Sequence, residues 1–137
     1  MTNDDQDLRL ALQRLARRIR SMQADEDVTE GQRAVLFALS NNGPQTLGSL
    51  SDHEHVTPPS MNRTINALVD LGLVTRVTDA VDARKVCLDL SAAGRDFIRE
   101  TRRRRDAWFT MRLATLSAEQ RRLLTEVGPI LKELADQ

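Results

Sequence analysis

The chain has 137 residues, about the length of one domain, and 40% of them are apolar, which is enough to build a core. It has no apolar run of about eighteen residues, and its first residues are acidic and polar, which argues against a membrane span and a secretory leader. The single cysteine, Cys87, excludes an internal disulfide framework. Because the net charge is zero, nucleic-acid binding requires a local basic cluster. We expect a cytoplasmic protein with one domain over residues 1–137.

Residues 6–23 are predicted to form an amphipathic helix. Apolar side chains recur there in steps of three and four, which places them on one face of about four helical turns. These positions are Leu8, Leu12, Leu15, Ile19 and Met22. Thr29 and Gln32 match a capping box that begins a second helix. Gly43, which tolerates the left-handed conformation, is expected to end it.

A helix-turn-helix is predicted next. A short helix over about 47–53 is followed closely by another, for which Thr57 is a suitable N-cap and Pro58 a suitable first residue. The apolar stripe of this second helix consists of Met61, Ile65, Leu68 and Val69. Gly72 suits the C′ position of a Schellman motif.

A β-hairpin is predicted after Gly72, because the apolar period changes from 3.6 to 2. Val86, Leu88 and Leu90 alternate with polar neighbours, as in a half-buried strand. Residues 73–78 supply the partner strand, and residues 79–84 form the loop between them.

Two further helices are predicted at the C-terminal end. Ser91 caps a long helix that runs to about Thr115, and Ser117 caps the last one. Gly128-Pro129 is expected to interrupt the last helix, because proline lacks the N–H that the helix needs.

The fold class that follows is mainly α with a small antiparallel hairpin. A winged helix-turn-helix over residues 28–91 is flanked by helices at about 6–23 and 92–135. The apolar faces of these flanking helices would form large exposed patches on a monomer, so we expect a homodimer. The predicted interface residues are Leu8, Leu12, Leu15, Ile19, Trp108, Leu123, Val127, Ile130, Leu131 and Leu134. The alternative is that these helices pack on their own domain.

The outward face of the second helix of the helix-turn-helix is predicted to bind DNA. Arginine matches the two acceptors of guanine, asparagine matches the acceptor and donor of adenine, and free N–H groups in the first turn attract anions. At the hairpin tip, Asp82 can orient Arg84 toward a minor groove. The predicted DNA-binding residues are Thr57, Pro58, Pro59, Ser60, Asn62, Arg63, Asn66, Arg84 and Lys85. The alternative is an ordinary solvated surface.

The chain resembles the MarR (multiple-antibiotic-resistance regulator) family of bacterial transcription regulators over essentially its whole length. The matching segments are Thr29-x-x-Gln32, Thr57-Pro58-Pro59-Ser60-Met61-x-Arg63, Leu71-Gly72-Leu73-Val74, Asp82-x-Arg84 and Leu90-Ser91-x-x-Gly94. The resemblance implies a homodimer with one recognition helix in each major groove of a pseudo-palindromic operator. It places Ser60 and Arg63 on base and phosphate contacts and Arg84 on a minor-groove contact. It also implies a repressor that is released by a small phenolic or aromatic-acid ligand bound between the dimer helices and the DNA-binding part.

The chain departs from the family pattern at two adjacent positions. Glu54 stands where the family usually has an apolar residue, and His55 where it usually has a small one.

Other functions have weaker support. Asp52, His53, Glu54 and His55 alternate acid and imidazole, but no third convergent metal ligand can be named. Cys87 has no visible resolving partner for oxidant sensing. The four arginines 102–105 encircle a helix and therefore suit solvent or an adjacent subunit better than a DNA-facing row. With no phosphate loop or nucleophile pair, no enzyme activity and no cofactor are expected. A winged helix used only for protein binding remains the main alternative.

Overall fold

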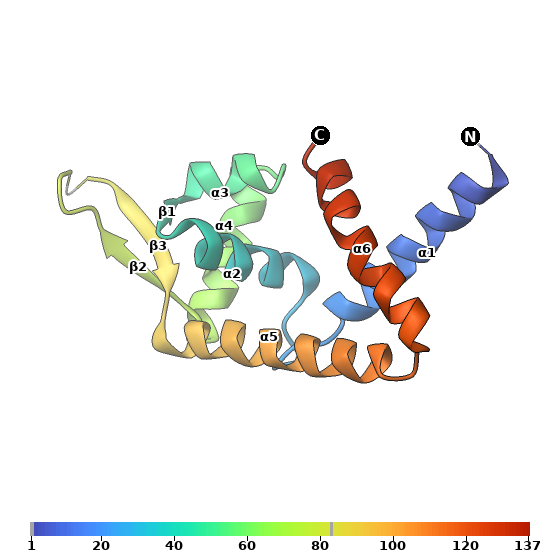
Figure 1. Cartoon of the computed structure of the whole chain (residues 1–137). Helices are drawn as coiled ribbons and strands as arrows, with labels where there is room; N and C mark the ends of the chain where they lie inside the picture. Colours follow the sequence, from blue (N-terminus) through green and yellow to red (C-terminus); the bar gives the residue numbers. More distant parts are fainter. Residues whose placement is uncertain (1, 83) are drawn as a thin grey trace. The chain divides into compact units, whose positions relative to one another are not determined.

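The structure is a computed structural model that describes residues 2–82 and 84–137. Ala83, which falls in the predicted hairpin loop, lies outside the described residues. The chain divides into two compact units. One is Gln23–Arg103, and the other joins the residues up to Met22 with Arg104–Gln137. The elements of both are labelled in Figure 1.

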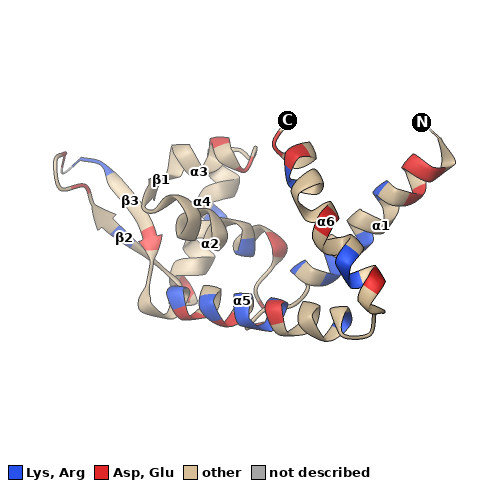
Figure 2. Ribbon diagram, viewed as in Figure 1, with Lys and Arg blue, Asp and Glu red and all other residues tan. Residues whose placement is uncertain are grey.

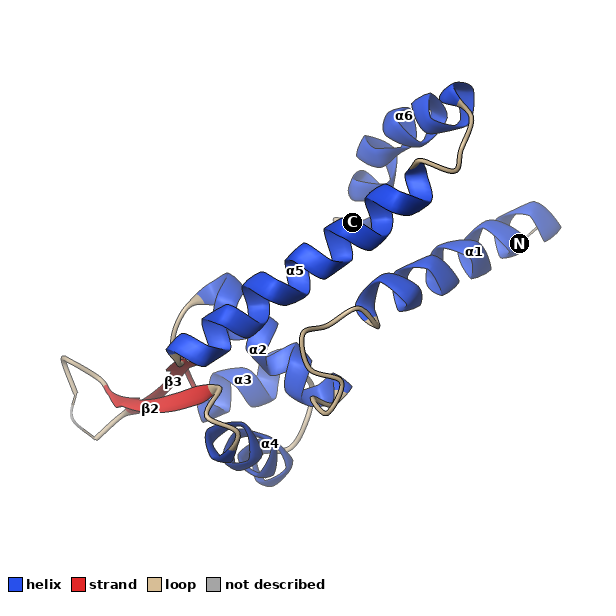
Figure 3. Cartoon of the chain, turned by 90° about the horizontal axis from the view of Figure 1, so that it is seen from below, coloured by secondary structure: helices blue, strands red, loops and turns tan. Residues whose placement is uncertain are grey.

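The Gln23–Arg103 unit contains the predicted helix-turn-helix and hairpin. Its elements are α2 (Glu30–Asn42), β1 (Gln45–Thr46), α3 (Leu47–His53), α4 (Pro58–Asp70), β2 (Val74–Thr78), β3 (Val86–Leu90) and the first part of α5 (Ala92–Leu113). The helices and the small sheet are distinguished by colour in Figure 3. A single apolar core joins them, and its most deeply buried side chains include Leu36, Leu39, Leu50, Ile65 and Leu68. The prediction of a mainly helical winged helix-turn-helix is confirmed.

Local capping explains where the helices of this unit begin. Thr29 Oγ1 accepts from the Gln32 N–H at 3.2 Å, and Gln32 Oε1 accepts from the Thr29 N–H at 3.0 Å, which completes the predicted capping box. Before α4, Thr57 Oγ1 accepts from the Ser60 N–H at 3.3 Å. Pro58 is the first residue of α4, as predicted.

A Schellman motif ends α4 and turns the chain into β2. Gly72 has φ 76°, in the left-handed region that favours glycine. Its N–H bonds the Val69 carbonyl at 2.9 Å, and the Leu73 N–H bonds the Leu68 carbonyl at 3.0 Å. The predicted stop signal is therefore confirmed.

The sheet has three antiparallel strands in the order β1-β3-β2, whereas the sequence predicted two. The missed strand, β1, has only two residues, too few to show a period. The predicted burial of Val86 is also wrong, since this side chain is 49% exposed. Leu88 and Leu90 are buried as predicted, so only the core end of the hairpin is covered.

Gly94 allows α5 to begin directly against the start of the hairpin. A Cβ atom at this position would lie 2.1 Å from the Leu73 carbonyl oxygen, closer than any real contact. Ser91 Oγ accepts from the Gly94 N–H at 3.0 Å and donates to the Gly72 carbonyl at 2.5 Å. Only glycine fits at position 94, which gives a physical reason for the predicted Ser91-x-x-Gly94 segment.

The second unit contains α1 (Asn3–Arg20), the end of α5 and α6 (Ala118–Ala135). Helix α1 begins three residues before the predicted start of 6, because Thr2 and Asp5 form a capping box that we overlooked. Hydrogen bonds from Thr2 lower the pKa of the Asp5 carboxyl. At the other end of α1, Arg105 donates to the carbonyls of Met22 and Arg20 at 3.2 and 3.4 Å.

The predicted interruption of the last helix is wrong. Helix α6 runs as one element through Pro129, after the predicted capping box of Ser117 and Gln120. Proline removes one helical hydrogen bond, the one to the Thr125 carbonyl. Thr125 is exposed, so water can replace that partner. No helix in the described residues is long and apolar enough to cross a membrane.

Candidate nucleic-acid interface

Helix α4 separates an apolar face from a polar one. Met61, Ile65 and Leu68 are at most 2% exposed and form the inner face. On the outer face, Asn62, Arg63 and Asn66 are exposed, and Ser60, one turn before Thr64, is half-buried. The arginine and the two asparagines predicted to meet base edges are therefore all solvent-accessible on one helix.

The first turn of α4 does not offer the free N–H donors that we expected. Thr57, Pro58 and Pro59 are exposed there, but neither proline has an N–H. The Ser60 N–H bonds Thr57 Oγ1, and the Met61 N–H bonds the Thr57 carbonyl at 2.9 Å. The N–H groups at this helix end that could attract an anion are therefore already bonded to the cap residue. Charged side chains must supply the attraction instead.

The hairpin loop, called the wing here (residues 79–85), carries the predicted Asp82–Arg84 pair. The side-chain nitrogen Nε of Arg84 lies 3.3 Å from Asp82 Oδ1. The backbone N–H of Arg84 donates to the same oxygen at 3.0 Å. The Arg84 side chain is nevertheless 92% exposed. Lys85 next to it is also exposed. The guanidinium is tethered at one nitrogen and leaves its other donors to solvent.

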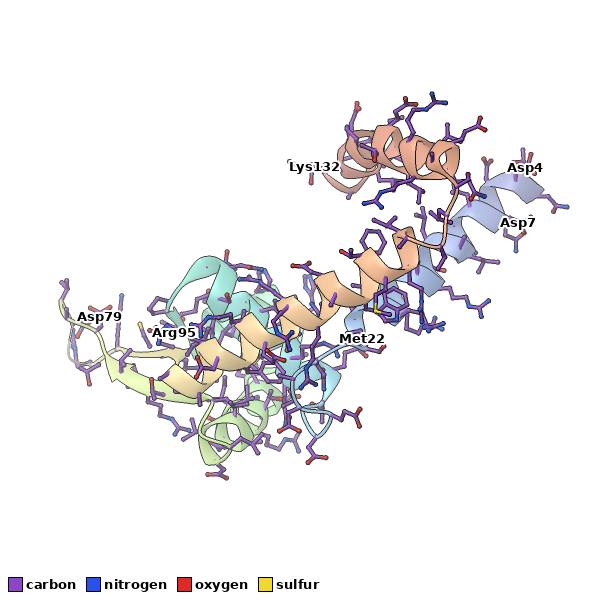
Figure 4. The ribbon with its side chains drawn as sticks, turned by 60° about the horizontal axis from the view of Figure 1, so that its bottom comes forward. Asp4, Asp7, Met22, Asp79, Arg95 and Lys132 are labelled. Atoms are coloured by element: carbon purple, nitrogen blue, oxygen red, sulfur yellow. The ribbon has the colours of Figure 1, made fainter. Side chains whose placement is uncertain are left out.

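Asp79 organises the wing, and the sequence analysis missed it. Its Oδ1 accepts from the N–H groups of Val81 and Asp82 at 2.7 and 3.0 Å, and its own N–H bonds the Lys85 carbonyl at 3.0 Å. These backbone bonds, with a smaller effect of Lys85, hold the pKa of the Asp79 carboxyl below its usual value. Figure 4 labels Asp79 in this loop. An aspartate whose side chain accepts from the N–H groups two and three residues later is a recognisable sequence signal for a turn.

Arg76 is a second missed residue of this face. It lies on β2, opposite the buried Leu88 in the sheet register and two residues after the buried Val74. Its Nη2 donates to Asn66 Oδ1 on α4. Arg76 also lines a pocket of about 250 Å³. The lining residues are Leu47, Asn62, Ile65, Arg76, Val86 and Leu88. An arginine two residues after Val74, on the same face of the strand, is the sequence signal that could have identified it.

The predicted interface residues all lie in the second unit. Neither α1 nor α6 has a buried residue. The exposed members of the set are Leu8, Leu15, Leu123, Ile130 and Leu134, and the half-buried ones are Leu12, Ile19, Trp108, Val127 and Leu131. The Trp108 ring lies between two guanidinium groups, those of Arg18 and Arg112, at 5.3 and 4.9 Å from its centroid.

The arginines of α5 are engaged within the chain. Figure 2 shows that this helix carries both basic and acidic residues. Arg99 pairs with Asp96 at 2.8 Å, and Arg103 pairs with Glu100 at 2.6 Å, which raises the pKa of Arg103. Arg102 lies 5.7 Å from the centre of the Phe37 ring.

The acid–imidazole segment at the end of α3, residues 52–55, has a structural explanation. Among the described residues, no three histidine, cysteine, aspartate or glutamate side chains converge as metal ligands would. His53 Nδ1 instead lies 3.2 Å from Glu54 Oε1. His55 has φ 55°, so it occupies the left-handed turn between α3 and α4, where the family usually has a small residue.

Comparison with known proteins identifies the family. Residues 28–86 match the model described as the MarR family. An HTH-type transcriptional regulator of Mycobacterium leprae is 38% identical over 131 residues, covering 96% of this chain and 92% of the relative. The chain belongs to the MarR family. Members are DNA-binding transcriptional regulators and not enzymes, which confirms both expectations for this MarR-family protein.

Solved structures share the fold along the whole chain. Rv1404 of Mycobacterium tuberculosis is 25% identical with a TM-score of 0.84, over 97% of this chain and 94% of that one. A mutant of S. aureus MepR bound to an oligodeoxyribonucleotide is 17% identical with a TM-score of 0.74, over 99% of each chain. The second likeness shows the fold of this MarR-family protein and no more.

Proposed function

We propose that this regulator binds a pseudo-palindromic DNA operator as a homodimer, with one α4 helix in each of two successive major grooves and one wing in each flanking minor groove. The observation that carries the proposal is the exposed row of Asn62, Arg63 and Asn66 on α4, in the same compact unit as the tethered Arg84. Arginine and asparagine have the donors that base edges require, and an oriented arginine suits a narrow minor groove. Thr57, Pro58, Pro59, Ser60 and Lys85 complete the proposed contact surface.

Dimerisation is supported by the apolar side chains of the second unit. Leu8, Ile130 and Leu134 are 57%, 56% and 58% exposed. Each belongs to a series of apolar residues that repeats at the spacing of one helix face, a pattern typical of helices that pack against another surface. Soluble monomers rarely carry such contiguous patches. A second copy of the chain, with the same patches, is the partner that would cover them.

We also propose that the protein is a cytoplasmic repressor released by a small phenolic or aromatic acid. The Gln23–Arg103 unit holds a pocket of about 450 Å³ that is lined by both apolar and charged side chains, within the size range of small-molecule sites. Its lining includes Leu39, Leu90, Ile98, Arg95, Arg99 and Arg102, together with Asp89, which pairs with Arg95 at 3.3 Å, so the arginines outnumber the single acid. Such a combination suits an apolar ring that carries a carboxylate.

The test is a mobility-shift titration with the duplex upstream of the protein's own gene, at two salt concentrations. The proposal predicts tighter binding to this duplex than to a shuffled one, weaker binding at higher salt and release by a phenolic acid such as salicylate. Equal affinity for both duplexes would contradict sequence-specific binding. Salt-insensitive capture of a protein, with no DNA shift, would favour the protein-binding alternative. Failure of salicylate and related acids to release the duplex would overturn only the ligand response.

A further inference from the structure

The contact between Arg76 and Asn66 fixes what one residue of the recognition surface can recognise. Arg76 Nη2, on β2, donates to Asn66 Oδ1, on α4, ten residues earlier in the chain. A guanidinium only donates hydrogen bonds, so the Asn66 atom that faces it must be the oxygen. The orientation of the amide group is therefore set by chemistry.

The oxygen held by Arg76 is the atom that an asparagine needs to recognise adenine. In that pairing Oδ1 accepts from the adenine N6 amino group while Nδ2 donates to N7. The bond from Arg76 occupies one of the two acceptor sites of Oδ1 and draws this oxygen toward β2, which leaves both N–H donors of Nδ2 available to a base. Guanine offers two acceptors, N7 and O6, on its major-groove edge and no donor beside them.

The position of Arg76 suits this holding role. The β2–β3 register places Arg76 opposite the buried Leu88. Its side chain also lines the small pocket that Ile65 and Leu47 border. Arg76 therefore borders the same pocket as several apolar side chains while its guanidinium bonds Asn66 on α4.

We infer that Arg76 is a positioning residue that makes Asn66 a donor, so that Asn66 selects guanine over adenine at one position of each half-site. This inference rests on the proposed function, because it requires α4 to meet base edges in the major groove. It differs from the expectation that asparagines on this helix pair with adenine.

The experiment is selection of bound duplexes from a library with a randomised central region, followed by sequencing. Full-length wild type, Asn66→Ala, Arg76→Met and the double variant are compared. The Asn66 position of the site is the one whose base preference Asn66→Ala abolishes. Arg76→Met keeps the apolar stem, and thermal melting checks that each variant is folded.

The inference predicts guanine at that position for wild type, and about tenfold weaker binding when 7-deazaguanine replaces it. In Arg76→Met the preference at this position alone should shift toward adenine, because the amide can then turn. The double variant should behave as Asn66→Ala does. Arg121→Met, which removes one exposed charge from α6, is the matched control and should select the wild-type site.

Three results would overturn the inference alone. One is adenine at the Asn66 position in wild type. Another is a uniform loss of affinity in Arg76→Met, with unchanged base preferences and a salt slope reduced by about one, as for a phosphate contact. A third is no position that depends on Asn66. Wild type that enriches no sequence would overturn the proposed function as well, and only that result would do so.

Discussion

The two units of the chain differ in where their apolar side chains lie. In the Gln23–Arg103 unit, core residues such as Leu36, Leu50 and Leu68 are fully buried. In the other unit, α1 and α6 contain no buried residue at all. Both units contain helices that begin with a complete capping box, α2 in one and α1 and α6 in the other, so this local signal does not distinguish the two. One unit is therefore stabilised by its own core, whereas the other leaves apolar side chains exposed, and these are the side chains that the proposed dimer would cover.

The largest expected effect is a difference in stability between alanine substitutions at two glycines, one in each unit. Gly94→Ala should destabilise the protein by about 3 kcal/mol or more, because the new Cβ would overlap the Leu73 carbonyl oxygen. Gly128→Ala meets no atom within 4 Å and lies inside α6, so it should stabilise by up to about 1 kcal/mol. Urea unfolding of both variants makes the comparison. Equal stability of the two would show that the close approach at Gly94 does not exist.

The next effect tests the exposed patches. Ile130→Glu places a charge where a side chain 56% exposed in the single chain is proposed to meet a second copy. We expect the dimer dissociation constant to rise by about 30-fold, from a cost of about 2 kcal/mol. Sedimentation at several concentrations measures it. Glu126→Gln, also exposed on α6, is the control and should leave the dimer intact. A dimer equally stable in Ile130→Glu would remove this face from the interface.

A smaller effect concerns the recognition face. Arg63→Ala should cost about 1–3 kcal/mol in binding and relax one base position, because arginine bonds two acceptors of guanine. Its thermal stability should match wild type, since Arg63 is exposed. Fluorescence anisotropy with the upstream duplex and a shuffled one measures both affinities. Equal losses on the two duplexes would assign Arg63 to the phosphates.

The smallest effect is local and depends on pH. The folded-state pKa of Asp79 is lowered, so its ionised form stabilises the wing above the ordinary value of about 3.9, and this contribution is lost as pH falls through the lowered pKa. NMR should show the Val81 and Asp82 amide signals titrating together below that value. Asp79→Asn should abolish the titration. Signals that titrate at the ordinary pKa would mean that the turn is not held by Asp79.

Sequence signals predicted what is local in the chain. Thr29 with Gln32 and Gly72 determine where α2 begins and α4 ends, and the apolar period identifies the inner face of α4. What was missed depends on distant parts of the chain. Strand β1 exists only through its pairing with β3, and Arg76 reaches α4 only because of the β2–β3 register. The effect of Pro129 was predicted wrongly, because the expectation that proline interrupts a helix ignores the water that can bond the freed carbonyl of an exposed helix.

The most direct test of the account is the mass of the complex formed with the upstream duplex, measured by native mass spectrometry as the protein is titrated. The account predicts two chains on each duplex that contains half-sites about 10 base pairs apart, with no stable one-chain complex. A single chain bound per duplex, with affinity unaffected by removal of one half-site, would contradict it.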